Sequence, residues 1–386
     1  MAEKNAIGKI VASLSELFNR SITVSNNDHK VYHNDADNLY PNRIELIEKN
    51  STTASSAANK MKSFIIGKGF ADLAFNDQIV NPHKRYSGYE FLELIADSVK
   101  THKGCFVHVN YDIEGKTNYL DVLKYKKCRV SKEDDKANKG KIYYKDWDSG
   151  KKIGVKKQDE QFFYPFNNNN EVIMAQRIKD CELKGIKNPT PDQLVENYRG
   201  QVYFFNLEVA EIYPHAWVHP AYNDADSEFR LSLYRNTGYR TGFLDKTILI
   251  ANGLDQESEK EFDKTVHEWL GAENSASVML LNTGQQVPDP EKMLTAVSLK
   301  GTYDSKRFDN DEKALANNIR KAYLAIPKIL IDPEDSFFGS SGEAFRAAVE
   351  YYNSETLFIR EKIAHMMDNF YIDSDFTILE LGEDGQ

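Results

Sequence analysis

The stretch Ile326–Phe345, "IPKILIDPEDSFFGSSGEAF", connects two segments that both have the pattern of long helices. It contains two prolines, two glycines and the adjacent pair Phe337–Phe338. A connector of this length is uncommon inside a compact domain and tends to be functional or disordered. From these residues alone, three interpretations stay open: a lid over an active site, a flexible linker, or a part that contacts something large.

The flanking segments carry apolar residues at steps of three or four, as amphipathic helices do. The first is predicted over 304–325, where the apolar positions are Phe308, Leu315, Ile319, Ala322 and Tyr323. The second begins near Glu343, with Ser340 and Glu343 as a capping box, and its apolar positions are Phe345, Val349, Tyr352, Thr356, Ile359, Ile363, Met366 and Phe370. At 1.5 Å per residue it spans roughly 42 Å, more than a small enzyme domain usually needs.

Another helix and a small β-α-β unit are predicted before these two. Residues 222–245 have helical composition. "KTILIA" (246–251) is a predicted strand, Asp255–Leu270 a predicted helix, and "SVMLLN" (277–282) the returning strand. The sequence thus predicts a compact unit over 246–303 between two helices.

The first 221 residues are predicted to be α+β. A helix over 42–64 ends at "GKGF" (67–70), and a second helix covers 89–103. A β-hairpin follows over 104–125, with its turn at Glu114–Gly115. Further strands are predicted at 128–130, 140–147, 161–166 and 200–207, with a short helix after the Asn167–Asn170 run.

Composition limits the class of protein. With 41% hydrophobic and 12% aromatic residues, the chain has enough apolar surface to fold. Its net charge of −10 argues against a protein that grips nucleic acid through a basic surface, but not against one that surrounds nucleic acid without holding it. Three widely spaced cysteines indicate reduced thiols. We find no apolar run long enough for a membrane span and no signal peptide, and expect a soluble protein made in a cytoplasm.

Signatures of catalysis are weak. Gly115–Lys116–Thr117 lacks the earlier glycine of a phosphate-binding loop, so we interpret it as a hairpin turn. The histidine pairs of "HKVYH" (29–33) and "HAWVH" (215–219) have a spacing that suits zinc only on a helix, and we predict neither metal nor cofactor. Glu343 and Asp335 are the candidate pair for acid–base catalysis. Ordinary roles, a helix cap for Glu343 and a solvated loop acid for Asp335, already explain both residues. A hydrolase with a mobile 326–342 lid remains the rival hypothesis, but we predict no enzyme.

The sequence resembles the portal (head-to-tail connector) proteins of tailed bacteriophages in their shorter form, and the similar segments occur in the same order along the chain. "LYPNRIELIEKNSTTASSAANKMKSFIIGKGF" is similar to the early portal segment, and "FLELIADSVKTHKGCFVHVNYDIEGKTNYLDVLKYKKCRV" to the following helix and strands. "NNIRKAYLAIPKILI" and "GSSGEAFRAAVEYYNSETL" resemble the family's later signatures. Together they cover most of the chain.

The resemblance implies an α+β portal fold with six parts. These are an α/β wing (1–221), a first stem helix (222–245), a clip (246–303), a second stem helix (304–325), a tunnel loop (326–342), and a long wing helix with a minimal crown (343–386). The short acidic C-terminus puts a crown-mediated role in doubt. The resemblance also implies a ring of about a dozen copies at one capsid vertex of the virion, assembled in the host bacterial cytoplasm.

Function and partners are likewise implied by the resemblance. Double-stranded DNA would pass through the ring during packaging and ejection. The large terminase, then neck adaptor and tail proteins, would dock on the ring, and major capsid and scaffold proteins would surround it. A different phage or conjugative subunit that assembles without a DNA bore is a third hypothesis.

Candidate residues follow from the implied parts. The tunnel loop, with its proline and glycine breakers, carries Lys328, Asp332, Glu334, Asp335, Phe337 and Phe338. The two phenylalanines pack either on a neighbouring loop or the long helix, or else in the local core. The stem channel face carries Lys306, Lys313, Asn317 and Arg320. The clip helix presents either a partner-binding or a solvated face with Glu257, Glu259, Lys260, Asp263, Lys264 and Trp269.

Overall fold

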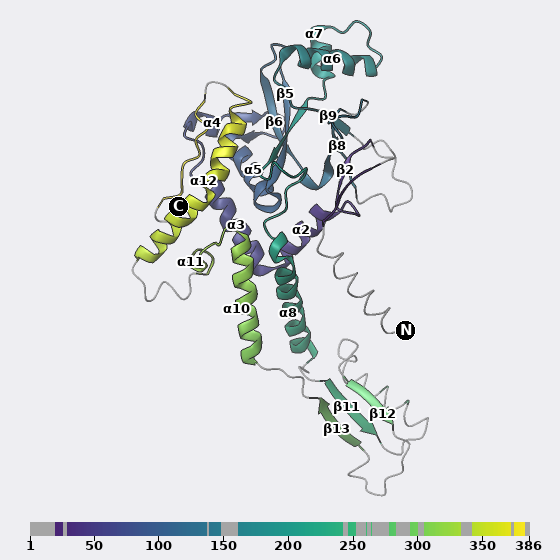
Figure 1. Ribbon diagram of the computed structural model, residues 1–386, viewed down its shortest axis with the longest axis vertical. Helices are drawn as coiled ribbons and strands as arrows, with labels where there is room; N and C mark the ends of the chain where they lie inside the picture. Colours follow the sequence, from purple (N-terminus) through teal and green to yellow (C-terminus); the bar gives the residue numbers. More distant parts are fainter. Residues whose placement is uncertain are drawn as a thin grey trace. The chain divides into compact units, whose positions relative to one another are not determined.

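The structure is a computed structural model that describes residues 20–25, 29–136, 139–147, 161–241, 246–251, 260, 264, 278–282, 294–299, 305–332, 342–371 and 374–382 (Figure 1). The chain divides into two compact units. Unit 1 comprises Met1–Tyr222 and Ile319–Gln386, and unit 2 comprises Asn223–Asn318. Mixed helix and strand in unit 1 confirms the predicted α+β class.

A six-stranded sheet forms the centre of unit 1, in the order β6-β5-β10-β9-β8-β7. Its strands are β5 (Gly104–Tyr111), β6 (Thr117–Leu123), β7 (Cys128–Val130), β8 (Ile142–Tyr144), β9 (Gln161–Pro165) and β10 (Gln201–Asn206). The predicted 104–125 hairpin is confirmed as the antiparallel pair β5–β6. All neighbours are antiparallel except β9 and β10, which run parallel.

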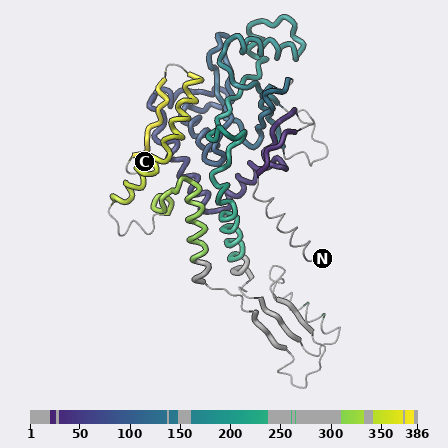
Figure 2. The backbone as a smooth tube through the Cα atoms, viewed as in Figure 1, coloured from purple at the N-terminus to yellow at the C-terminus, as the bar shows by residue number. Residues whose placement is uncertain are grey.

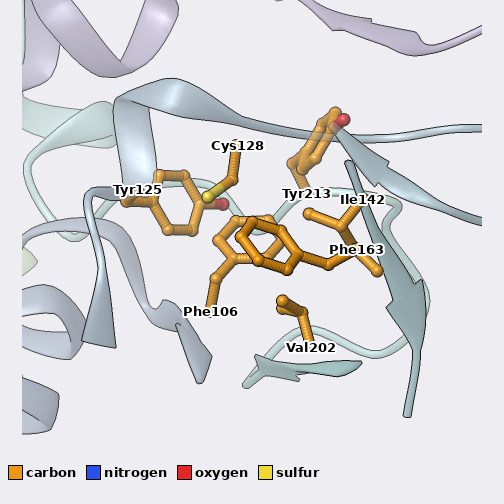
Figure 3. Packing of buried hydrophobic residues seen from close by; sticks show 7 residues of the cluster. All are labelled: Phe106, Tyr125, Cys128, Ile142, Phe163, Val202 and Tyr213. Atoms are coloured by element: carbon orange, nitrogen blue, oxygen red, sulfur yellow. The ribbon is translucent and has the colours of Figure 1, made fainter. Parts of the chain in front are cut away.

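One apolar core lies against this sheet (Figure 3). It consists of Phe106, Tyr125, Cys128, Ile142, Phe163, Val202 and Tyr213. The residues come from five strands and two connecting segments, so sequence positions a hundred apart share one core. Cys105, Cys128 and Cys181 are buried free thiols, as expected, and burial raises the pKa of Cys105 and Cys128.

Helix α5 (Gly88–His102) packs against β5 and β6, and helices α2 (Tyr40–Asn50) and α3 (Thr52–Ile66) pack against α5 and against each other. The single helix predicted over 42–64 is wrong, because the chain breaks at Ser51. Ser51 is extended (φ −89°, ψ 120°), and its side chain accepts a hydrogen bond from the Ala54 N–H. A serine in this position caps a new helix rather than continuing the old one. The small residues of α3 serve close packing, since Ala54, Ala57 and Ala58 are fully buried.

Unit 1 also contains shorter elements. They are β1 (Ile22–Val24), β2 (Tyr32–Asn34), α4 (Leu73–Asp77), β3 (Ile79–Asn81), β4 (Tyr86–Ser87), η1 (Tyr125–Lys127), α6 (Asn170–Leu183), α7 (Pro191–Glu196) and η4 (His219–Ala221). Of these, α6 confirms the helix predicted after the asparagine run, with Asn169 as its cap.

The long helix near the C-terminus is confirmed as α12 (Gly342–Met367). It packs against α3, from the opposite end of the sequence (Figure 2). The predicted apolar positions from Val349 to Phe370 are buried, and Phe345 is half-buried. The predicted Ser340 cap lies outside the described residues.

Residues 374–382, which we expected to form at most a small crown, pack into unit 1. The Leu379 N–H donates to the Gly69 carbonyl (2.9 Å), and the Lys68 N–H donates to the Leu379 carbonyl (2.9 Å). Phe376 is buried with Phe70 and Phe75 in edge-to-face ring contacts. This segment closes on the "GKGF" turn because Phe376 and Ile378 are apolar.

Unit 2 contains most of α8 (Tyr222–Thr241) and of α10 (Ser305–Ala322), as predicted, and a three-stranded sheet in the order β12-β11-β13. Strands β11 (Lys246–Ala251) and β12 (Val278–Asn282) are parallel, as a β-α-β unit requires. We did not predict β13 (Leu294–Leu299), which pairs antiparallel with β11. Of the predicted helix 255–270, only Lys260 and Lys264 are described, and both are helical.

No helix within the described residues is long and apolar enough to span a bilayer.

Candidate functional site

Helix α10, the predicted second stem helix, has two faces. Lys313, Asn317 and Arg320 lie at steps of four and three on one face. The opposite face carries Ile319, which is fully buried. Lys313 and Asn317 are exposed, whereas Arg320 is half-buried. Burial lowers the pKa of Arg320, and Asp332 opposes that shift. Lys306 lies in the first turn of α10, and its side chain is outside the described residues.

Helices α8 and α10 are linked by an ion pair between Arg235 and Glu312. Both residues belong to unit 2. The two helices that flank the small sheet in the sequence are therefore in direct contact. No local pattern predicts this ion pair, because the two residues are 77 positions apart.

The end of α10 is an unusual chain reversal. Leu324 and Ala325 both have left-handed backbones, with φ of 55° and 50°. Such conformations are unfavourable for residues with a Cβ and persist where the surroundings hold them. The Ile326 N–H donates to the Arg320 carbonyl (3.2 Å), and the Tyr352 hydroxyl of α12 donates to the Tyr323 carbonyl (3.0 Å).

Tyr323 anchors this reversal to a buried carboxylate. Its hydroxyl donates to Glu48 Oε2 on α2 (3.2 Å). Glu48 Oε1 accepts from Thr101 Oγ1 (2.9 Å) and from Lys100 Nζ (3.1 Å), both on α5. Burial and the nearby Glu48 charge raise the pKa of Tyr323 well above its ordinary value, so the hydroxyl keeps its proton. We call Glu48, Lys100, Thr101 and Tyr323 the Glu48 node. It fixes the end of α10 to α2 and α5.

The connector Ile326–Phe345 is not loop throughout. Residues Lys328–Ile331 form the short helix α11, with Leu330 buried. This helix packs against α3 and α12, so the prediction of a tunnel loop beginning at 326 is wrong for its first residues. Pro327 places the helix start, as a proline at a helix N-terminus does. Lys328 forms an i,i+4 ion pair with Asp332 (3.7 Å).

The remaining predicted tunnel-loop residues, Glu334, Asp335, Phe337 and Phe338, lie outside the described residues. The same holds for Glu257, Glu259, Asp263 and Trp269 of the predicted clip helix. Lys260 and Lys264 are exposed.

The rival hydrolase site is not assembled by the described residues. Glu343 is exposed in the first turn of α12, and Asp335 is not described. A cavity of about 800 Å³ is lined by residues of α2, α3, α5 and β6 and their neighbours, none of them from 326–342.

The histidine pairs do not form a metal centre among the described residues, where no group of three or more ligating side chains occurs. The rings of His215 and His219 lie 5.0 Å apart, outside any α-helix. His215 contacts Glu208 (3.2 Å), and His219 Nδ1 contacts the Tyr40 hydroxyl (3.1 Å).

Comparison with protein-family models and with curated protein sequences found no match. Among solved structures, a chain from the neck of an empty GTA particle, computed with C6 symmetry, matches at a TM-score of 0.50 and 12% identity. The match covers 89% of this chain and 84% of that chain.

Two further structures are similar at lower scores. A chain from the neck of a native GTA particle, computed with C12 symmetry, has a TM-score of 0.45 and 13% identity over 95% of this chain and 86% of that one. An HK97 family phage portal protein from Corynebacterium diphtheriae has a TM-score of 0.43 and 8% identity over 85% and 91%. At these identities the likeness concerns the fold alone. The fold of this chain is similar to that of the GTA neck chain in the first match.

Proposed function

We propose that this protein is a portal-type subunit that forms a ring at one vertex of a phage-like particle, with double-stranded DNA passing through the ring. The observation that carries the proposal is the fold match to a GTA neck chain over 89% of this chain. That neck was computed with C6 symmetry, which supports a cyclic assembly here. The proposal is also supported by the order of elements along the chain: a mixed helix-and-strand region, helix α8, a small sheet, helix α10 and the long helix α12.

In the proposed ring, α8 and α10 are the stem, and the face with Lys306, Lys313, Asn317 and Arg320 lines the channel. The Arg235–Glu312 pair keeps the two helices together. The clip at 246–303 docks the large terminase during packaging and then the neck adaptor, through the helix that contains Lys260 and Lys264. Capsid and scaffold proteins contact the wing.

The tunnel loop is proposed to lie between α11 and α12 and to surround the DNA. The Lys328–Asp332 pair cancels one charge of each sign, so Glu334 and Asp335 give the segment its negative charge. Carboxylates repel phosphates, and DNA then slides without the affinity that counterion release gives to a binding protein. The Glu48 node and α11 hold the start of the loop on the wing. The function is therefore mechanical.

The test is the assembly state of the purified full-length chain, by light scattering and negative-stain microscopy. We expect a ring of about a dozen subunits with a central hole wide enough for a duplex. A clean monomer at high concentration, both alone and with capsid and scaffold proteins present, would overturn the proposal. Hydrolytic turnover that is lost in Glu343→Gln would favour the rival enzyme.

The loop assignment has a separate test. Glu334→Lys with Asp335→Lys should slow DNA packaging into particles, most strongly at low ionic strength, where charges are least screened. The matched control is Glu182→Lys with Glu196→Lys, two exposed acids on α6 and α7. Equal packaging yields for both variants at low salt would contradict the electrostatic role of the loop.

A further inference from the structure

Helix α12 has an outer face that the described residues of its own chain leave exposed. One side of the helix is buried from Val349 to Met367. On the other side Tyr351, Leu357 and Phe358 are 45%, 42% and 40% exposed. A helix with apolar residues on both sides is typical of a helix that is buried on both sides in its final assembly.

Two parallel columns of residues lie on this exposed side. At 100° per residue, Ala344, Ala347, Tyr351 and Phe358 fall within about 60° of one another. Beside them, within about 20°, lie the acids Glu343, Glu350, Glu361 and Asp368. We call these the apolar column and the acid column. The acid column runs along about 38 Å of helix and the apolar column along about 21 Å, which are lengths of a protein interface rather than of a small-molecule site.

A surface of the opposite charge lies elsewhere in unit 1. Residues 124–145 contain nine Lys and Arg against three Asp and Glu, in a chain with net charge −10. Arg129 is buried, Lys126 pairs with Glu45, and Lys132 pairs with Asp134. The other lysines on and around β7 and β8 form what we call the basic surface: Lys124, Lys127, Lys136, Lys139, Lys141 and Lys145.

Lys127 and Lys145 are neighbours on this surface. The Lys145 N–H donates to the Lys127 carbonyl (3.1 Å). The ammonium of Lys127 lies over the Tyr144 ring (5.9 Å), and that of Lys145 over the Trp147 ring (4.3 Å). Strand β7 at the edge of the sheet and its neighbour β8 thus carry the basic surface, and two of its lysines lie over aromatic rings.

Figure 1 shows α12 and strands β8 and β9 on opposite sides of unit 1. A subunit in a cyclic ring must present two different, complementary surfaces, one to each neighbour. We therefore infer, on the basis of the proposed ring, that the acid and apolar columns of α12 dock on the basic surface of β7 and β8 of the adjacent copy. The partner is a second copy of this chain. The apolar column supplies buried area, and the charges set orientation and register.

The inference is tested by charge reversal and rescue in the full-length chain. Variant A is Glu350→Lys with Glu361→Lys, and variant B is Lys127→Glu with Lys145→Glu. Each alone places like charges across every interface of the ring, and we expect at least a tenfold lower ring fraction by light scattering. Variant AB restores opposite charges at every interface and should recover rings. The matched control, Glu182→Lys with Glu196→Lys, should assemble like the native chain.

Phe358→Asp tests the apolar column without altering the basic surface. It should yield a monomer with native circular dichroism and at least tenfold fewer rings, because a charge would be buried in the interface. If this variant unfolds, the charge-reversal series decides alone.

The outcomes separate this inference from the proposed function. If the native chain forms no rings under any condition, the proposed function fails. If it forms rings and A or B assembles normally, or if AB is not rescued, the inference is wrong and the ring stands. If A and B keep their rings but no longer enter capsids, the surfaces bind a shell protein, and the inference is again wrong.

Discussion

Tyr323→Phe removes a single hydroxyl from the Glu48 node. Tyr323 is fully buried, and its hydroxyl donates to Glu48 Oε2 at 3.2 Å. Glu48 keeps its two other donors, Lys100 and Thr101. The variant therefore weakens the attachment of the end of α10 to α2 and α5 without leaving the carboxylate unpaired.

The size of the effect follows from the kind of hydrogen bond. A hydrogen bond to a charged group contributes about 1.5–3 kcal/mol to stability. The 3.2 Å distance is at the long end for an O–H donor, so we expect a loss of about 1.5 kcal/mol. In a cycle with Glu48→Gln, the two changes should be non-additive by at least about 0.5 kcal/mol, because they remove the same contact.

The assay is urea unfolding of the purified chain, followed by hydrogen exchange of residues 319–332. Tyr89→Phe is the control, since Tyr89 is 37% exposed on α5, and we expect it to change stability by less than about 0.5 kcal/mol. Hydrogen exchange of residues 319–332 should be faster in Tyr323→Phe than in the native chain, and unchanged in Tyr89→Phe. Additive effects with Glu48→Gln, or unchanged exchange in that segment, would refute the view that the Glu48 node holds the end of α10.

Three further predictions concern unit 1. Ala325→Gly should stabilise the chain by about 0.5 kcal/mol, because exposed Ala325 is left-handed (φ 50°), and a lower thermal midpoint would contradict this. Gly67→Ala should cost about 2 kcal/mol or more and expose residues 374–382 to protease, since a Cβ there would overlap the Leu379 carbonyl. Burial by itself would raise the pKa of Glu45. The hydrogen bonds from His102 and Lys126 outweigh this effect, and the net result is a pKa lowered from 4.5 to about 2. The stability that Glu45 contributes is therefore present above pH 4.5 and lost as pH falls toward 2. In Glu45→Gln the free energy of unfolding, measured with urea, should depend less on pH between 4.5 and 2.

Local sequence patterns were sufficient for most elements. The 3.6-residue spacing of apolar side chains located α5, α10 and α12, because one buried stripe suffices to define an amphipathic helix. The turn at Gly115, with φ of 84°, was predicted because glycine tolerates the left-handed backbone of a tight hairpin. The order of elements, and the resemblance built on it, also followed from sequence alone.

Errors occurred where local signals conflicted. Ser51 was interpreted as part of a helix because the residues around it are good helix formers, yet its side chain caps α3. Pro327 was interpreted as a loop breaker, but a proline also starts helices, and α11 follows it. The β13 strand was missed because its pairing with β11 joins residues more than forty positions apart.

The sequence by itself determined the α+β class, the helices α5, α10 and α12, and the β5–β6 hairpin, because periodicity and turn chemistry act over a few residues. Only the tertiary structure decided which distant groups meet. Glu48 and Tyr323 are 275 positions apart, and Arg360 binds Glu380 while donating to the Phe64 carbonyl. Such contacts depend on how whole elements pack, and no local pattern encodes the partner of a buried charge.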